Sequence, residues 1–264
     1  MTFQPVVPSG GIVGWRFLQR TYEGQFQSFS SSAANDRETK YFMENIGKVQ
    51  SAEDLVSDRR LLQVALGAFG LEGDLDNRFF VHKILEDGTQ ADDALSNRLA
   101  DKRYREFSDA FGFGPGAARK TALRTNMEEI AQANLSARFE IAVGASDETM
   151  RIALYAQREL ADLANSTSSA DTKWFDLMGL PPLRSMMETA LGLPPSFAQL
   201  DIDAQLVEFK DRLFQLTGSE DLAQFSDQNA ITELTDTYLA RSQIAQLQNT
   251  ISPAQTALIL LGAV

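Results

Sequence analysis

His82 is the only histidine in the chain, and the chain contains no cysteine. A Ser-His-Asp triad or a Cys-His pair would therefore have to use His82 or be absent. His82 lies among apolar residues in the segment 79–85, and no neighbouring residue completes a catalytic constellation. These features favour a structural histidine, packed or half-exposed, over a catalytic base. A zinc site is also poorly supported, because one imidazole and no thiolate are available.

A glycine-rich segment superficially resembles a phosphate-binding loop. It comprises Gly112-Phe113-Gly114-Pro115-Gly116 and is followed by Arg119-Lys120-Thr121. No Gly directly precedes the Lys-Thr pair and no expected strand leads into the segment, so the nucleotide-binding motif is not matched. A helix end followed by a helix start at Pro115 explains these residues better. Binding of an anion at this helix start stays an alternative.

Basic and aromatic residues between Arg98 and Phe107 superficially resemble a nucleic-acid-binding surface. Acidic residues interleave with them at the i,i+4 spacing of a helix, which predicts ion pairs along one solvated face. The expected pairs are Asp101–Arg105, Lys102–Glu106 and Arg105–Asp109. A formal net charge of −12 also disfavours nucleic acid and anionic membranes as partners.

Two Asp-x-Asp sequences, Asp74–Asp76 and Asp201–Asp203, could offer carboxylates to calcium. Neither has the Gly and the distal Glu of a helix–loop–helix calcium loop. Each precedes an apolar stretch, so capping of the following helix is the simpler interpretation. We therefore predict no catalytic, cofactor-binding or metal-binding residue, no cofactor, and a chain that is not an enzyme.

Helices must position nearly all of these residues. Apolar residues recur at helical spacing almost throughout, and strict alternation is scarce, which predicts an all-α, compact multi-helix protein. The expected helices span residues 10–30, 35–48, 52–69, 75–86, 91–98, 101–111, 117–144, 147–165, 170–178, 182–191, 203–217, 219–225, 227–249 and 253–262.

Several of these helices end in one signal, an apolar residue, then Gly, then Leu or Phe. The glycines of this signal are Gly70, Gly112 and Gly192, with a related sequence at Gly179. Gly closes a helix in the left-handed conformation, and the next apolar residue folds back onto the last turn. Leu71 should therefore contact Leu66. Helix starts are marked by a capping box at Ser51 and Asp54 and by the pair Ser252-Pro253.

The two halves of the chain show a weak likeness. Thr39-Lys40-Tyr41-Phe42 parallels Thr172-Lys173-Trp174-Phe175, and both segments are followed by a glycine helix stop. We expect a single all-helical domain of residues 1–264, with possible pseudo-repeats 11–113 and 147–241 joined by the long helix 117–144. A shared helical pattern could also produce much of this likeness. The halves should pack together, because no Pro/Gly-rich linker separates them.

The two ends of the chain bear on its location. The first residues lack the basic and apolar regions of a cleavable signal peptide. The apolar stretch Thr256–Val264 is shorter than the ~20 residues of a membrane span. We expect a cytoplasmic or flagellum-associated protein without a membrane span. The apolar C-terminal helix could pack on the body of the protein, or a partner or second copy could cover it.

Most of the chain resembles a bacterial family of proteins of unknown function, number 1217. The resemblance is specific in the first half. The segments that carry it are Glu53–Leu62, Ala65–Leu71, Lys83–Leu85, Leu99–Tyr104 and Ala110–Phe113, with Gly10–Thr21, Arg151–Tyr155 and Ala190–Pro194. Members occur mainly in alphaproteobacteria and are often encoded beside flagellar genes. The resemblance implies an all-helical fold and a flagellar connection, and it implies no catalytic residue.

The function expected from these observations is that of a non-enzymatic structural or interaction protein, associated with flagellar assembly or function. Its partners should be proteins, with flagellar components as candidates. One alternative is a small-ligand-binding or enzymatic helical protein, with a site between the two halves near His82 or the turn 112–116. A second alternative is an export chaperone or adaptor. The sequence leaves the oligomeric state open.

Overall fold

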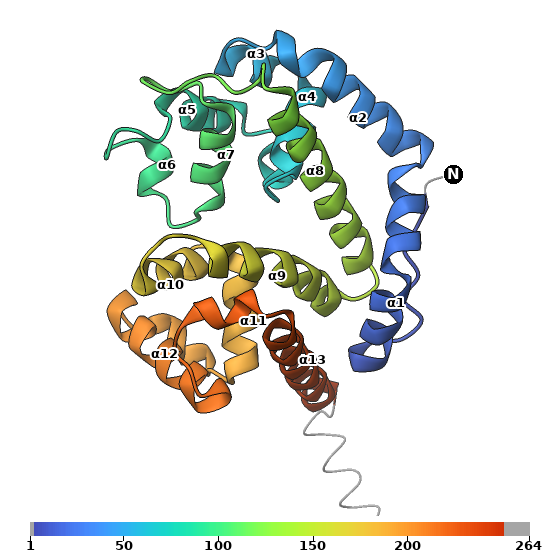
Figure 1. Ribbon diagram of the computed structural model, residues 1–264, viewed down its shortest axis with the longest axis vertical. Coiled ribbons are helices and arrows are strands. Elements are labelled where there is room, and N and C mark those ends of the chain that lie inside the picture. The colour runs from blue at the N-terminus through green and yellow to red at the C-terminus, as the bar shows by residue number, and fades with distance from the viewer. Residues whose placement is uncertain (1–2, 251–264) are drawn as a thin grey trace, which may run out of the picture. The chain divides into compact units, whose positions relative to one another are not determined.

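A computed structural model describes residues 3–250 of the chain, and within that range every regular element is a helix (Figure 1). The expected all-α fold is confirmed. No helix among these residues is long and apolar enough to cross a membrane. The expected helix 253–262 and its start at Ser252-Pro253 lie outside the described residues.

The chain divides into two compact units. Of the described residues, the first unit holds 3–6, 18–146 and 179–181, and the second holds 7–17, 147–178 and 182–250. The first unit contains α2 (Ala33–Asn45), η1 (Ile46–Lys48), α3 (Ala52–Ser57), α4 (Arg59–Gly67), η2 (Glu72–Asp74), α5 (Arg78–Asp87), α6 (Leu95–Arg98), α7 (Arg103–Phe111) and α8 (Arg124–Gly144). The second contains α9 (Glu148–Asn165), α10 (Ala170–Met178), α11 (Pro181–Leu191), η3 (Pro195–Gln199), α12 (Ile202–Thr217), η4 (Leu222–Ser226) and α13 (Gln228–Thr250). The first helix, α1 (Gly11–Ser30), contributes its start to the second unit and the rest to the first.

Helix α4 lies at the centre of the first unit, where it contacts α2, α3 and α8 (Figure 1). Its apolar residues recur at helical spacing, and Leu62 and Leu66 are fully buried, as is Phe42 of α2. A Cβ built on Gly67 would lie 2.3 Å from Oδ1 of Asn134 in α8. The close approach of α4 and α8 therefore depends on the missing side chain of Gly67.

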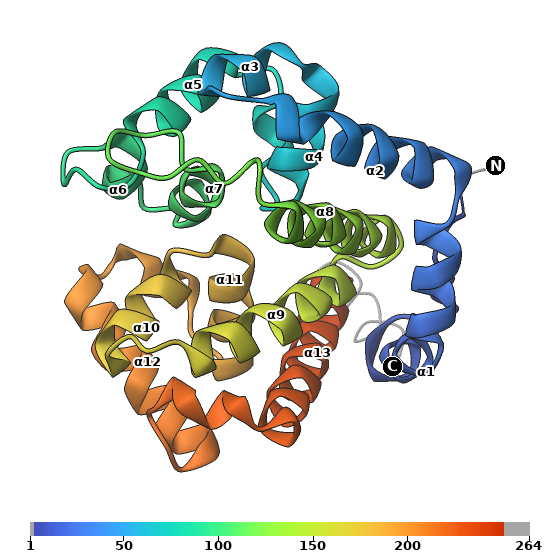
Figure 2. The same ribbon diagram turned by 45° about the horizontal axis from the view of Figure 1, so that its top comes forward.

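Aromatic rings form the core of the second unit. Trp174 of α10 stacks on Phe209 of α12 with ring centroids 5.5 Å apart, and Phe197 meets Phe209 edge-on at 4.7 Å. The indole N–H of Trp174 donates to the carbonyl of Glu220 at 3.1 Å. Figure 2 shows α13 running along α9, which it contacts. Burial of these rings supplies much of the apolar surface that holds the unit together.

The glycine helix stops follow the expected conformation at three of the four positions. Gly70, Gly112 and Gly192 have φ of +65°, +65° and +67°. The N–H of Leu71 donates to the carbonyl of Leu66 at 3.0 Å, so the expected return of Leu71 onto the last turn is confirmed. Gly179 does not adopt a positive φ, because α11 begins almost at once, at Pro181.

The expected helix 52–69 is broken at Asp58, which separates α3 from α4. Asp58 is extended, with φ −91° and ψ 99°. Its Oδ1 accepts the N–H groups of Arg60 and Leu61 at 2.9 and 3.1 Å, and its Oδ2 accepts the hydroxyl of Tyr41 at 2.7 Å. The break follows because Asp58 caps a new helix. The capping box of Ser51 and Asp54 at the start of α3 is confirmed.

Asp58 should also make stability depend on pH. Burial opposes its ionisation, but hydrogen bonds from Tyr41, Leu61 and Arg60 outweigh burial and lower the pKa of its carboxyl below 3.8. The stabilisation is therefore present above about pH 4 and is lost as the pH falls through the lowered pKa. We expect Asp58→Ala to lower the free energy of unfolding by about 1 kcal/mol at pH 7, measured by urea unfolding. Asp58→Asn, which can still cap, should lose less. A loss that grew below pH 4 would contradict the role of the carboxylate.

The expected helix 117–144 is shorter in the structure, where α8 starts at Arg124. The N–H of Lys120 donates to the carbonyl of Phe111 at 3.0 Å, which ties the segment to the end of α7. A helix over these residues would need that N–H for its own hydrogen bonds. Two other expected helices are also shorter. The range 91–98 contains only α6, which begins at Leu95, and in place of the helix 219–225 the chain forms the 3₁₀ helix η4, Leu222–Ser226.

An internal duplication is not shown by the structure. In the parallel segments, Phe42 is fully buried but its counterpart Phe175 is half-buried, whereas Trp174 is fully buried and its counterpart Tyr41 is half-buried. The two helices therefore turn different positions of the shared sequence toward their cores. The pseudo-repeats 11–113 and 147–241 stay a prediction.

Candidate functional site

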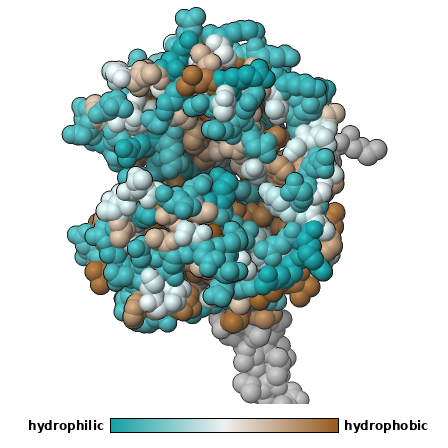
Figure 3. All heavy atoms as spheres, in the orientation of Figure 1, coloured by the Kyte–Doolittle hydropathy of each residue, from teal (hydrophilic) through white to brown (hydrophobic). Residues whose placement is uncertain are grey.

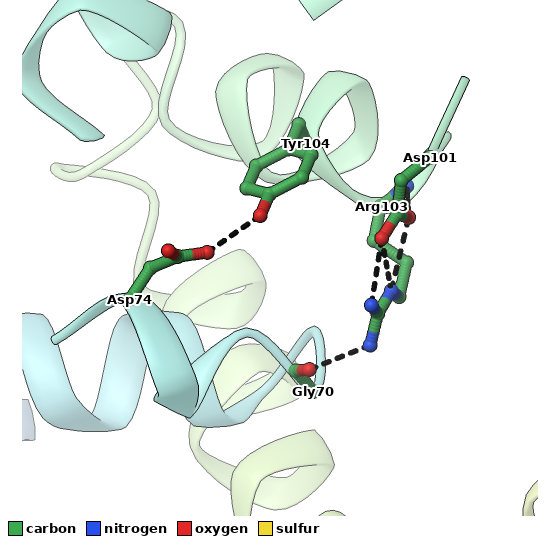
Figure 4. Close-up of polar contacts among 5 residues, drawn as sticks. All are labelled: Gly70, Asp74, Asp101, Arg103 and Tyr104. Carbon is green, nitrogen blue, oxygen red and sulfur yellow. Dashed lines mark hydrogen bonds and ion pairs between the residues drawn. The ribbon is translucent and has the colours of Figure 1, made fainter. Parts of the chain in front are cut away.

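A group of polar contacts between separate segments of the first unit joins the start of α7 to the turn after α4 (Figure 4). Arg103 donates from Nη2 and Nε to the carboxylate of Asp101, at 2.6 Å and 3.0–3.1 Å. Its Nη1 donates to the carbonyl of Gly70 at 2.6 Å. The hydroxyl of Tyr104 donates to Oδ2 of Asp74 at 2.5 Å. We call these five residues the α7 clamp.

The electrostatics of the α7 clamp suit structural bonding. Burial raises the pKa of the Tyr104 hydroxyl, and the hydrogen bond to Asp74 raises it further. The phenol therefore stays protonated and acts as a hydrogen-bond donor. Arg103 has its fork directed at Asp101 and at the left-handed helix stop of Gly70. The clamp can hold α7 against the end of α4.

Removing one hydroxyl tests the clamp. We expect Tyr104→Phe to lower the free energy of unfolding by about 1–2 kcal/mol, because Asp74 loses a donor. Since the folded-state pKa of Tyr104 is raised, wild-type stability should fall as the pH rises above about 10, the ordinary value for tyrosine. Tyr104→Phe should lack the part of this decrease in stability that comes from ionisation of Tyr104. Identical alkaline unfolding curves for the two proteins would contradict the assignment.

His82 is a half-buried residue of α5 between two carboxylates. Its Nε2 lies 3.5 Å from Oε2 of Glu53 in α3, and its Nδ1 lies 3.8 Å from Oε2 of Glu86 one turn later. Among residues 3–250, no group of three or more His, Cys, Asp or Glu side chains is placed to hold a metal ion. His82 thus faces one carboxylate of α3 and one of its own helix, and it lies in one of the two positions, packed or half-exposed, that the sequence predicts for it.

The basic residues after the glycine-rich turn are all engaged with protein groups. Nη1 of Arg119 and Oγ1 of Thr121 both donate to the carbonyl of Val49, each at 2.8 Å. Nζ of Lys120 lies 2.9 Å from Oδ2 of Asp109. The turn itself is a backbone contact, since a Cβ on Gly114 would lie 2.2 Å from the Cα of Gly88. Gly112 closes α7 in the left-handed conformation, as expected. The expected helix start at Pro115 is wrong, because the next helix, α8, begins at Arg124.

The ion pairs expected along residues 101–109 are replaced by others. Asp101 pairs with Arg103, and Asp109 pairs with Lys120. Helix α7 begins only at Arg103, so Asp101 lies outside the helix and cannot use the i,i+4 spacing.

The two Asp-x-Asp sequences differ in role. Asp201 caps α12, with its Oδ1 accepting the N–H of Ala204 at 2.9 Å, as expected. Asp74 caps no helix. It accepts side-chain donors from Tyr104 and from Asn77, at 2.5 and 2.7 Å. Asp76 pairs with Arg59 at 2.5 Å.

The start of α1 is held to the second unit by a buried ring and an ion pair. Trp15 is fully buried in the second unit, and the next residue, Arg16, pairs with Asp236 of α13. A Cβ on Gly14 would lie 1.6 Å from the carbonyl oxygen of Ser9, so the turn that leads into α1 requires glycine at this position. The sequence signal for this contact is a tryptophan that follows several closely spaced glycines.

Burial also raises the pKa of the Tyr238 hydroxyl in α13 to about 12. The carboxylates of Glu148 and Asp147 add to this effect, and a hydrogen bond with Ser242 opposes it. This phenol is therefore protonated at neutral pH, like that of Tyr104.

Comparisons with known proteins place the chain in a family. No curated protein matches the sequence. A crystal structure of a protein from Agrobacterium tumefaciens is similar, with a TM-score of 0.73 and 21% identity over 92% of this chain and 99% of that one. At this identity the likeness shows the fold alone. The family model described as "Protein of unknown function (DUF1217)" matches residues 68–231, which is more than half of the chain. The chain therefore belongs to the DUF1217 family.

Proposed function

We propose that this protein is a non-enzymatic interaction protein associated with flagellar assembly or function. The observation that carries the interaction role is the concentration of exposed hydrophobic side chains in the second unit, on and beside α12 and near the end of α13. They are Leu200, Ile202, Val207, Phe214, Leu216, Ile244 and Leu247. Among them, Val207 and Phe214 share one face of α12, and exposed apolar residues grouped on one face are typical of protein contacts.

Figure 3 shows a largely hydrophilic face with hydrophobic residues interspersed, as expected for a net charge of −12. In the first unit the exposed hydrophobic residues lie on separate elements, for example Phe79 at the start of α5 and Ile141 in α8. Single exposed residues of this kind are normal on protein surfaces.

The polar groups described above also support this proposal. The α7 clamp and the basic residues after Gly116 bond to other parts of the first unit, and His82 lies beside Glu53 of α3. Their bonds contribute to holding helices together. The flagellar part of the proposal rests on the gene context of the family that the sequence resembles.

Co-purification tests the proposal. The full chain, tagged at its chromosomal locus, would be isolated from its native bacterium after mild crosslinking, beside a tag-only strain. We expect flagellar components to be enriched over the tag-only strain, and deletion of the gene to impair motility. Retained motility together with an eluate free of flagellar components would contradict the flagellar association. A turnover of a small substrate by the purified chain would contradict the non-enzymatic role.

A further inference from the structure

The outer face of α12 carries two apolar residues that the fold of the second unit does not use. Phe209 and Leu213 on the opposite face are fully buried and hold α12 to the core. Val207 and Phe214 are 67% and 56% exposed. They are seven residues apart, so they share one helix face and lie about 10 Å apart along its axis.

The same face is acidic. Asp203 and Asp211 are exposed at positions i−4 and i+4 from Val207, and within the described part of the chain neither forms an ion pair. Asp211 accepts a hydrogen bond from the amide of Gln215 at 2.6 Å, which leaves its charge in place. The lysine of this face, Lys210, pairs with Asp171 of α10, which neutralises its charge. We call Asp203, Val207, Asp211 and Phe214 the α12 stripe.

We propose that the α12 stripe binds an amphipathic helix of a partner protein, with apolar residues two helical turns apart and Lys or Arg beside them. This inference rests on the proposed interaction role and names the surface and the chemistry of the partner. Apolar anchors spaced i and i+7 match the contact pattern of a helix laid against a helix. The two carboxylates, which no cation of the described chain neutralises, favour a basic partner, because complementary charge steers association.

A second copy of this chain is a poorer occupant of the α12 stripe. A symmetric contact would place the same patch on both subunits, so Asp203 and Asp211 would face carboxylates of the other copy. Like charges brought together at an interface oppose association. The net charge of −12 adds a repulsion of the same sign.

A synthetic peptide tests the surface directly. The probe is a fluorescein-labelled helix of Leu and Lys with leucines at i, i+3 and i+7, and the readout is fluorescence anisotropy with the full chain. We expect saturable binding, which Val207→Ser with Phe214→Ser weakens about tenfold or more, because anchor residues carry most of the affinity. Asp203→Asn with Asp211→Asn should weaken binding and reduce its dependence on salt.

Matched variants in the first unit control for nonspecific hydrophobic or electrostatic binding of the peptide. Phe79→Ser removes a phenylalanine that is 86% exposed, and Asp92→Asn with Asp93→Asn removes two exposed carboxylates. Both should leave peptide binding unchanged. Equal weakening by these controls, equal binding of a Leu/Glu peptide, or no binding by the wild type would overturn the proposal. Circular dichroism would check that each variant is folded.

Photo-crosslinking in cells separates this inference from the proposed function. p-Benzoylphenylalanine at position 214, with position 79 as the control, should crosslink to a segment whose sequence is basic and amphipathic. Crosslinks to an acidic segment or to a second copy would overturn the partner chemistry. If flagellar components still co-purified with the Val207→Ser, Phe214→Ser variant, the α12 stripe would be excluded and the proposed function would stand.

Discussion

Trp174→Ala should lower the free energy of unfolding of the second unit by about 3–5 kcal/mol, the usual cost of removing a large buried aromatic residue. The Trp174 ring is fully buried, stacks on Phe209 and donates its N–H to the carbonyl of Glu220. The substitution therefore removes apolar burial, a ring contact and a hydrogen bond together. Urea unfolding followed by circular dichroism measures the loss.

Phe214→Ala provides the matched control for Trp174→Ala. Phe214 lies in the same unit, on α12, but is more than half exposed, so its truncation should change stability by less than about 0.5 kcal/mol. Trp174→Phe should recover part of the loss, because it keeps a ring against Phe209. Equal effects of Trp174→Ala and Phe214→Ala would show that Trp174 is not the centre of this core.

Gly70→Val should lower the free energy of unfolding of the first unit by about 2–4 kcal/mol, from backbone strain and a disturbed hydrogen bond. Gly70 has a φ of +65°, which a β-branched residue rarely adopts. A Cβ there would lie 3.2 Å from Nη1 of Arg103, the atom that donates to the Gly70 carbonyl. The variant should therefore loosen the end of α4 and the α7 clamp together.

Gly73→Val is the control for Gly70→Val. Gly73 lies three residues further on, has no positive φ, and a Cβ there would meet nothing within 4 Å. Its substitution should change stability by less than about 0.5 kcal/mol. Thermal unfolding of the two variants beside the wild type compares them. Full stability of Gly70→Val would contradict both the left-handed helix stop and its support by Arg103.

The residues that the sequence offers as candidates for chemistry lie in contacts between parts of the fold. Substitutions that test stability therefore also test the role of these residues. His82 of α5 lies 3.5 Å from a carboxylate oxygen of Glu53 in α3, and Lys120 ties the segment before α8 to α7. The surface proposed to bind a partner contains none of these residues. Losses of stability in the first unit and losses of binding at the α12 stripe can therefore be measured on separate variants.

The sequence by itself determined the helical class, most helix positions, the glycine stops and the capping box at Ser51. These features depend on residues within one or two turns of each other. Apolar periodicity places the buried face of a helix, and Gly70, Gly112 and Gly192 close helices because the left-handed conformation costs glycine little. The same local signals mark the capping box of α3, since both of its partners lie within four residues.

Only the tertiary structure decided where polar side chains find their partners. Arg103 bonds to the carbonyl of Gly70 and Tyr104 to Asp74, across 33 and 30 residues of chain. The packing of α7 against the turn after α4 selects these pairs, so the spacing rule that suggested Asp101–Arg105 does not apply. The exposure of Val207 and Phe214 could not be predicted from the spacing of apolar residues either. An apolar residue on a helix is predicted to be buried, and only the packing of neighbouring elements shows which helix face is covered.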